Sequence, residues 1–241
     1  MTLDELTALE VAEEARKRKA AAMPKVEIPP PITETVEERM NKLGAKIRMQ
    51  EQIIDVSRNE DRKSELLKAA NLPKRHERKT LDFSNGPWKT NFEAICKKLG
   101  TGFLVALIGI RGAGKTQMGV ELVRVQAERL KTAEFTTAMD IFLSVKATYR
   151  KDSAVDERDI ATKFAAPRLL VIDEIQERAE TAWEDRILTH LINRRYNDER
   201  DTLLIGNLTP EQFAANVGPS ILSRLTETGG IIQCNWESFR K

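Results

Sequence analysis

The stretch "GIRGAGKT" at residues 109–116 follows directly on the apolar run "FLVALI" and constrains the fold more than any other part of the chain. Glycines at this density let successive backbone N–H groups approach an anion closely, which a Cβ would obstruct. The spacing from Gly109 to Gly114, Lys115 and Thr116 fits a P-loop, in which the lysine reaches the terminal phosphates and the hydroxyl binds Mg²⁺. The helical periodicity of the next segment adds a positive helix end beside the loop. The sequence therefore predicts a nucleotide-binding site here.

From residue 86 onward, strand-like and helix-like segments alternate along the chain. The strands are continuous apolar runs, which are typical of a parallel sheet covered on both faces. They are expected at 103–108, 134–138, 169–173, 202–206 and 230–235, and the helices at 114–130, 139–150, 156–165, 182–198 and 210–225. This pattern predicts an α/β fold, namely a three-layer P-loop domain around a parallel five-stranded sheet.

A second informative stretch, "RLLVIDEIQ" at 168–176, ends a buried strand with two acids. Acids at the carboxyl end of a parallel strand face the phosphate crevice. We therefore expect Asp173 to hold Mg²⁺ through its water shell and Glu174 to act as the general base on an attacking water. Asn207 follows the next buried strand and is predicted to orient that water. Arg224 is either an ordinary surface ion-pair partner or, if subunits form a ring, a finger in the neighbour's site.

The first 80 residues are highly charged and lack glycine-rich loops and strand-like runs. A helix is expected from Thr2 to about Ala22, because "TLDE" suits a capping box, and a proline-rich linker follows at 23–33. A second helix opens at "TVEE", 35–38, and carries one narrow apolar stripe. The stripe consists of Val36, Met40, Leu43, Ile47 and Ile54. A stripe this thin must pair with another helix, either within the chain or on a partner protein.

Composition excludes several classes of protein. The formal net charge of the 241 residues is +2, so any nucleic-acid binding must come from local basic patches. Cys96 and Cys234 have no CxxC or histidine-rich neighbourhood, which favours buried small residues over a zinc site. No segment has the apolar length of a signal peptide or of a transmembrane helix, so we expect a soluble, cytoplasmic protein without membrane contacts.

Five stretches in this order resemble the DnaC/IstB-type AAA+ ATPases: "GIRGAGKT", "LLVIDEIQ", "LINRRYNDERDTLLIGNLT", "SILSRL" and "NWESFR". The ending "NWESFR", together with "LPKRHERKTLDF" before the core, resembles the DnaC-type replicative helicase loaders in particular. The similarity covers roughly residues 72–241. It implies an ATPase that uses ATP and Mg²⁺, associates with itself through the ATP site, and places a hexameric replicative helicase on single-stranded DNA.

The resemblance also implies roles by position. Lys115 and Thr116 correspond to Walker A, Asp173 and Glu174 to Walker B, Asn207 to sensor 1, Arg224 to the finger that acts in trans and Arg240 to a sensor-2 arginine. The implied nucleotide contacts are Gly109, Ile110, Arg111, Gly112, Ala113, Gly114, Lys115, Thr116, Gln117 and Arg240. In these loaders the helix after the second strand contacts single-stranded DNA. The matching stretch, "FLSVKATYR", offers Lys146, Tyr149 and Arg150, and a cation beside an aromatic ring suits phosphate contact plus base stacking.

The chain departs from the family pattern at two places. Gly206 stands where the family usually has Ser or Thr, which predicts a looser strand end. Few residues follow Arg224, so we expect no separate lid domain, and this departure argues against a lid-borne contact from Arg240. The predicted organisation is a helical, helicase-binding region at 1–70, a basic connector at 71–85 and an AAA+ ATPase domain at 86–241.

Three other functions are alternatives to the loader. A transposition helper ATPase acting on duplex DNA would share the core motifs, and a preference for duplex DNA would identify it. A small-molecule P-loop kinase would leave Glu174, Asn207 and Arg224 unexplained, and phosphate transfer to a metabolite is its test. An ATP-switched adaptor would still deliver helicase after a Lys115→Ala substitution.

Overall fold

The computed structural model of the chain describes residues 13–14, 16–17, 35–77, 86–150 and 154–239. Residues 13–14 and 16–17 are helical. The rest of the expected first helix, the proline-rich linker at 23–33, residues 78–85 of the connector and Arg240 lie outside the described residues. None of the described helices combines the length and apolarity needed to cross a membrane.

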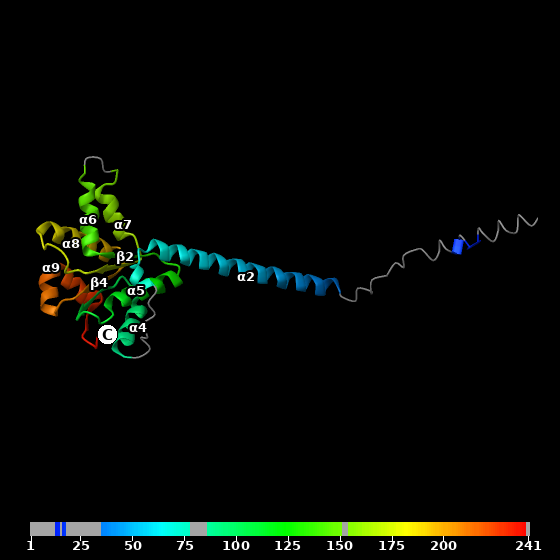
Figure 1. Ribbon diagram of the computed structural model, residues 1–241, viewed down its shortest axis with the longest axis horizontal. Coiled ribbons are helices and arrows are strands. Elements are labelled where there is room, and N and C mark those ends of the chain that lie inside the picture. Colours follow the sequence, from blue (N-terminus) through cyan, green and yellow to red (C-terminus); the bar gives the residue numbers. More distant parts are fainter. Residues whose placement is uncertain (1–12, 15, 18–34, 78–85, 151–153, 240–241) are drawn as a thin grey trace, which may run out of the picture. The chain divides into compact units, whose positions relative to one another are not determined.

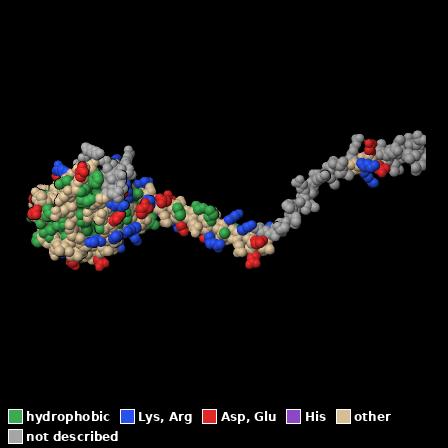
Figure 2. Space-filling model, turned by 90° about the horizontal axis from the view of Figure 1, so that it is seen from below, with side chains coloured by type: hydrophobic (Ala, Val, Ile, Leu, Met, Phe, Trp, Pro, Cys, Tyr) green, Lys and Arg blue, Asp and Glu red, His purple; other side chains and the backbone are tan. Residues whose placement is uncertain are grey.

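Helix α2 (Val36–Ala69) begins with the expected capping box. The Thr35 N–H donates to Glu38 Oε2 at 2.8 Å, and the Glu38 N–H donates to Thr35 Oγ1 at 3.2 Å. Four side chains of the apolar stripe are exposed: Met40 (63%), Leu43 (53%), Ile47 (50%) and Ile54 (50%). Figure 2 shows hydrophobic side chains between charged ones along this helix. The chain divides into two compact units, residues 1–52 and 53–241.

The second unit contains a sheet of five parallel strands in the order β2-β3-β4-β1-β5. The strands are β1 (Leu104–Gly109), β2 (Ala133–Thr137), β3 (Leu169–Asp173), β4 (Asp201–Gly206) and β5 (Gly230–Cys234). All five strands expected from the sequence are confirmed, with ends that differ by no more than one residue. Because β1 lies between β4 and β5 and β4 lies beside β3, the carboxyl ends of β1, β3 and β4 meet at one edge of the sheet.

Helices cover both faces of the sheet, as Figure 1 shows. Alternate side chains along a strand point to opposite faces, so Leu104 and Ala106 of β1 join one core while Val105 and Leu107 join the other. The first core is closed by α6 (Ala138–Thr148), α7 (Glu157–Ala165), α8 (Ala182–Asn197) and α9 (Pro210–Thr228). The second is closed by α4 (Pro87–Lys98) and α5 (Lys115–Glu128). The three-layer α/β fold predicted from the sequence is therefore confirmed.

Two features of the helices differ from the sequence-based expectation. Helix α4 and the single turn α3 (Lys74–Glu77) were not expected; α4 lacks a side-chain N-cap, although Pro87 at its start is typical of a first helical position. Helix α9, expected as one continuous segment, is broken at Gly218, whose backbone has φ 77° and ψ 167°. Pro219 follows the break and cannot donate an N–H to the preceding turn, so α9 consists of two halves.

The two cysteines occupy different environments. Cys234 ends β5 beside Gly109 and has no exposed surface, and burial raises the pKa of its thiol to about 12. Cys96 on α4 is partly buried, and burial raises its pKa as well, although nearby Arg129 opposes the shift. The expectation of buried small residues is thus met fully at Cys234 and in part at Cys96.

Candidate nucleotide-binding site

The glycine-rich loop joins β1 to α5 and requires glycine at its two ends. Gly109 has φ 127°, and a Cβ there would lie 2.7 Å from the Cys234 carbonyl oxygen. Gly114 has φ 76°, and a Cβ there would lie 3.0 Å from Trp88 Nε1. Helix α5 begins at Lys115, so its N-terminal end faces the loop. The local structure is the anion-binding turn that the sequence predicts.

Three donors from outside the loop hold its carbonyl groups. The Phe239 N–H donates to the Gly112 oxygen at 3.0 Å, Trp236 Nε1 donates to the Ala113 oxygen at 2.9 Å, and Trp88 Nε1 donates to the Gly114 oxygen at 3.1 Å. In a trans peptide the C=O and the following N–H point in opposite directions. Holding these three carbonyl groups therefore also fixes the directions of the N–H groups of residues 113–115, which belong to the predicted anion-binding loop.

A cavity of about 340 Å³ lies against this loop, which is in the size range of small-ligand sites. Its lining comprises His76, Arg111, Gly112, Gly114, Lys115, Thr116, Gln117, Asp173, Glu174, Glu177, Ile205, Asn207 and Phe239. Lys115 Nζ donates to the carbonyl oxygens of Gly109 (3.0 Å) and Ile110 (2.6 Å), so the ammonium lies across the loop. Of the residues 109–117 predicted to contact a nucleotide, Gly109, Ile110 and Ala113 are not part of this lining.

Thr116 and Asp173 form a direct contact on the cavity wall. The Thr116 hydroxyl donates to Asp173 Oδ2 at 2.7 Å, and the Glu174 N–H donates to Asp173 Oδ1 at 2.7 Å. Burial raises the pKa of Asp173, while Thr116, the Glu174 N–H and Lys115 oppose that rise. Two hard oxygen ligands beside a phosphate cradle fit Mg²⁺, which typically binds one or two protein oxygens and takes its other ligands from water and phosphate. The described residues contain no cluster of three or more acids, histidines and cysteines that would hold a metal alone.

Glu174 and Asn207 reach the same cavity from the ends of β3 and β4. Glu174 has φ 54°, a left-handed conformation that is uncommon for glutamate and turns the chain sharply after the strand. Burial raises its pKa, the charges of Asp173, Glu177 and Asp140 add to the rise, and Arg111 opposes it. The Asn207 N–H donates to Gln176 Oε1 at 3.1 Å, which ties the end of β4 to the loop after Glu174.

The expected loosening of β4 at Gly206 is wrong. A Cβ at Gly206 would lie 2.9 Å from Ile175 Cγ2, so glycine there admits the Ile175 side chain. The Ile175 N–H also donates to the Ile205 carbonyl oxygen at 3.0 Å. The end of β4 is consequently fixed by packing and by hydrogen bonding to the loop after β3.

Sequence reasoning missed four residues of the cavity, of which Ile205 was predicted only as part of a strand. His76 comes from α3, and its Nδ1 lies 2.9 Å from Gln117 Oε1. Phe239 belongs to "NWESFR", a stretch quoted for its resemblance but given no contact, and Glu177 lies one turn beyond Glu174. No periodic pattern marks the segment that contains His76. The only sequence signal for a role of His76 in the site is its place in a basic segment just before the core.

Arg224 lies on the second half of α9 and is not part of the cavity lining. Its Nη1 donates to the Ser220 carbonyl oxygen and to Ser220 Oγ, both at 2.8 Å, and its guanidinium lies 5.1 Å from the centre of the Tyr196 ring. A residue that acts in a neighbouring subunit's site must lie away from the cavity of its own chain, and Arg224 does. Its predicted role in trans stays a prediction.

The predicted DNA contacts gather around an aromatic side chain that the sequence did not single out. Trp183 Nε1 donates to the Tyr149 hydroxyl at 3.2 Å, and the two rings meet edge to face. Lys146 Nζ lies 5.3 Å from the centre of the Trp183 ring. Arg150 is exposed next to Tyr149, which is itself 58% exposed. The arrangement combines positive charge with aromatic rings on one surface, where α6 meets the start of α8.

A parallel sheet with a phosphate-binding loop after β1 and acids at the end of β3 defines a P-loop ATP-binding domain. The family model described as IstB-like ATP binding protein matches residues 35–241. The chain therefore belongs to this family of ATP-binding proteins.

Individual relatives agree with this assignment. The chain is similar to the replicative helicase loader DnaC of Escherichia coli K12, with 27% identity over 133 residues, which are 55% of this chain and 54% of DnaC. The chain thus matches about half the length of this curated relative. A crystal structure of the DnaC helicase loader shares the fold at a TM-score of 0.57 and 17% identity, covering 67% of this chain and 99% of that one. A structure of the replication initiator DnaA bound to AMPPCP and single-stranded DNA shares the fold at a TM-score of 0.55 and 16% identity. The match covers 68% of this chain and 50% of that one.

Proposed function

We propose that this protein uses ATP to load a hexameric replicative helicase onto single-stranded DNA. The observation that carries the proposal is the gathering of Lys115, Thr116, Asp173, Glu174 and Asn207 around one cavity. A second carboxylate beside the Mg²⁺-binding acid suits hydrolysis by water, which a metabolite kinase does not need. The similarity to a DnaC helicase loader supports the substrate and the partner.

In this proposal the loop binds the phosphates of ATP, and Lys115 moves from the loop carbonyls to the terminal phosphates. Thr116 and Asp173 hold Mg²⁺, which neutralises charge on the phosphates when bound. Glu174 accepts a proton from the attacking water, and Asn207 orients that water.

Subunits meet at the ATP site, so that Arg224 of one subunit stabilises charge in the site of the next. Hydrolysis then depends on assembly.

The partner contacts are proposed from the surfaces. Lys146, Tyr149 and Arg150 bind single-stranded DNA, with Trp183 as a neighbouring aromatic, because stacking rings next to cations suit unpaired bases and phosphates. Residues 1–70 bind the helicase, in part through the exposed apolar residues of α2. Residues 71–85 form the connector and 86–241 the ATPase domain.

The helicase contact is tested in the full chain with the cognate hexameric helicase and ATP, by measuring the mass of the complex. Leu43→Ala with Ile47→Ala shortens two stripe residues and keeps good helix formers, so α2 should persist. We expect the complex to be lost. The matched control is Lys46→Ala with Gln50→Ala on the same helix, which should bind as the wild type does. Equal binding by both variants would remove α2 from the interface.

Hydrolysis is tested by Glu174→Gln, with Glu177→Gln as the matched control in the same cavity. Glu174→Gln should bind ATP and lose steady-state turnover, because an amide cannot accept the proton. Normal turnover by this variant, with loss in Glu177→Gln instead, would assign the base to Glu177.

A second candidate function is a transposition helper ATPase that acts on duplex DNA, which the match to the IstB-like family model favours. The two functions differ in the DNA that stimulates hydrolysis. Stimulation by single-stranded oligonucleotides supports the loader, whereas stimulation by the same sequence only as a duplex supports the helper.

A further inference from the structure

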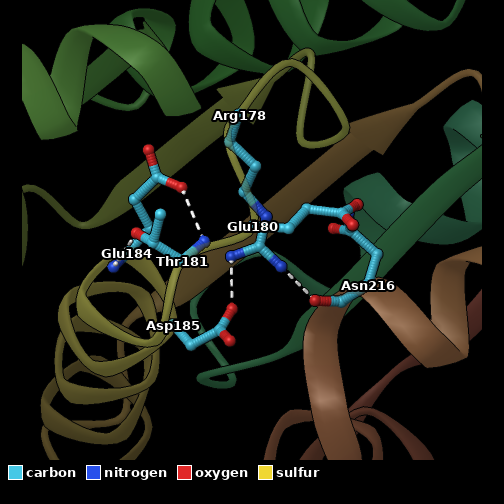
Figure 3. A network of polar contacts seen from close by, with 6 residues as sticks. All are labelled: Arg178, Glu180, Thr181, Glu184, Asp185 and Asn216. Atoms are coloured by element: carbon cyan, nitrogen blue, oxygen red, sulfur yellow. Dashed lines mark hydrogen bonds and ion pairs between the residues drawn. The ribbon is translucent and has the colours of Figure 1, made fainter.

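One buried cation connects the loop that leaves the candidate site with the broken helix α9. Arg178 lies in the loop between β3 and α8, and its side chain is only 1% exposed. Its Nη1 donates to Asp185 Oδ1 at 2.7 Å in the first turn of α8, and its Nη2 donates to the carbonyl oxygen of Asn216 on α9. Figure 3 shows the guanidinium between these two helices.

The carbonyl group that Arg178 contacts lies just before the break in α9. The first half of α9 ends at Gly218, and the last carbonyls of a helix have no donor within the helix. A positive charge at this end is also favoured by the helix dipole. The break leaves the last carbonyl groups of this half-helix without helical donors. Arg178 supplies one such donor, together with a positive charge at the helix end.

A second bond joins the same two elements in the opposite direction. Asn216 Nδ2 donates to Glu180 Oε1 at 2.7 Å. The start of α8 is fixed by a capping box between Thr181 and Glu184, so Asp185 has a defined position from which to hold Arg178. The loop and α9 are consequently linked twice, next to an anchored helix start.

The loop that carries Arg178 also carries the chemistry of the candidate site. Residues 174–178, here called the catalytic loop, place Glu174 and Glu177 in the cavity. Gln176 accepts the Asn207 N–H, and the Glu177 N–H donates to the Glu174 carbonyl oxygen at 2.8 Å. A shift of Glu174 or Asn207 on nucleotide binding would therefore shift Arg178 as well.

The far half of α9 begins after Gly218 and carries Arg224. Phe213 and Val217 of the first half lie in the same core cluster as Ile221 and Leu225 of the far half, so a shift of the first half is passed to the second through this packing. We propose that Arg178 is a positioning residue that couples the catalytic loop to the far half of α9, and so makes the orientation of Arg224 depend on the nucleotide. This inference rests on the proposed ATPase function and adds a route by which one subunit's site would govern its contact with the next.

The test is hydrogen exchange of the full chain with and without AMPPCP and Mg²⁺, followed in peptides from 109–117 and 219–228. In the wild type, the nucleotide should slow exchange in both peptides. Arg178→Gln should keep the response of 109–117 and lose that of 219–228, by about fivefold in exchange rate or more, the lower end of typical coupling between sites. Arg178→Lys should restore part of it, because a lysine keeps the charge but lacks the planar fork that reaches two acceptors.

The matched control is Arg186→Gln, which removes an exposed arginine from α8 and should respond as the wild type does. If Arg178→Gln fails to fold, Asn216→Ala decides the matter, since it removes only the bond to Glu180 and suits a helix. It should weaken the 219–228 response and spare that of 109–117.

The outcomes separate the two ideas. An unchanged 219–228 response in Arg178→Gln, or in Asn216→Ala where the first variant does not fold, overturns the coupling. So does a wild type that responds only at 109–117, although nucleotide binding then stands. A wild type that responds in neither peptide overturns the nucleotide site and the coupling with it.

Discussion

Replacing Trp236 by phenylalanine tests whether the residues after β5 preorganise the phosphate-binding loop. The substitution keeps an aromatic ring and removes the donor to the Ala113 carbonyl oxygen, a bond of 2.9 Å to a residue with no exposed surface. A buried acceptor left without its donor costs about 1–3 kcal/mol. For a domain of this size, the melting temperature should fall by roughly 2–4 °C for each kcal/mol lost.

The same change should weaken ATP binding, because the nucleotide must then order the loop itself. Each kcal/mol spent on ordering raises the apparent Kd by about fivefold. Thermal melting and calorimetric titration with ATP and Mg²⁺ measure both effects. Trp183→Phe is the control, since it removes an indole donor to the exposed Tyr149 hydroxyl, far from the loop in sequence. If Trp236→Phe melted and bound ATP as this control does, the argument from the loop carbonyls would fail.

Three further substitutions have defined outcomes. Gly114→Ala should abolish ATP binding in titrations, because the added Cβ would contact Trp88 and the backbone has a positive φ that alanine avoids. Gly86→Ala is the control: Gly86 also has a positive φ, but no atom lies within 4 Å of an added Cβ, so the affinity for ATP should be kept. Lys115→Ala should lose both nucleotide affinity and hydrolysis; unchanged affinity would contradict its proposed contact with the phosphates. Tyr149→Ala should weaken single-stranded DNA binding by about 1–3 kcal/mol in anisotropy measurements, and no change would remove it from the DNA surface.

The sequence predicted the features that depend on neighbouring residues. A glycine loop between a strand and a helix, and acids at the end of an apolar run, are local patterns, and both lie where they were expected. Contacts between distant segments were not predictable in this way. Trp236 and Ala113 are 123 residues apart, and no sequence pattern near either residue predicts their hydrogen bond.

The break in α9 is an intermediate case. The Gly218-Pro219 dipeptide is a strong signal for interrupted structure, but apolar residues continue at helical spacing on both sides of it. The apolar periodicity therefore predicted one continuous helix, whereas the non-helical backbone of Gly218 divides α9 into two halves. Arg178 could not be singled out from sequence, because its importance comes from burial between helices that are joined only in the folded chain.

The burial of the native thiols makes the chain well suited to site-selective chemistry. Burial raises the pKa of Cys234 to about 12, so this thiol is almost entirely protonated at pH 7, whereas the thiolate is the form that reacts with maleimides. Cys96 is also shifted towards the unreactive form. A cysteine introduced at an exposed position such as Ile47 would therefore label first, and a fluorophore there could report partner binding without removal of either native cysteine.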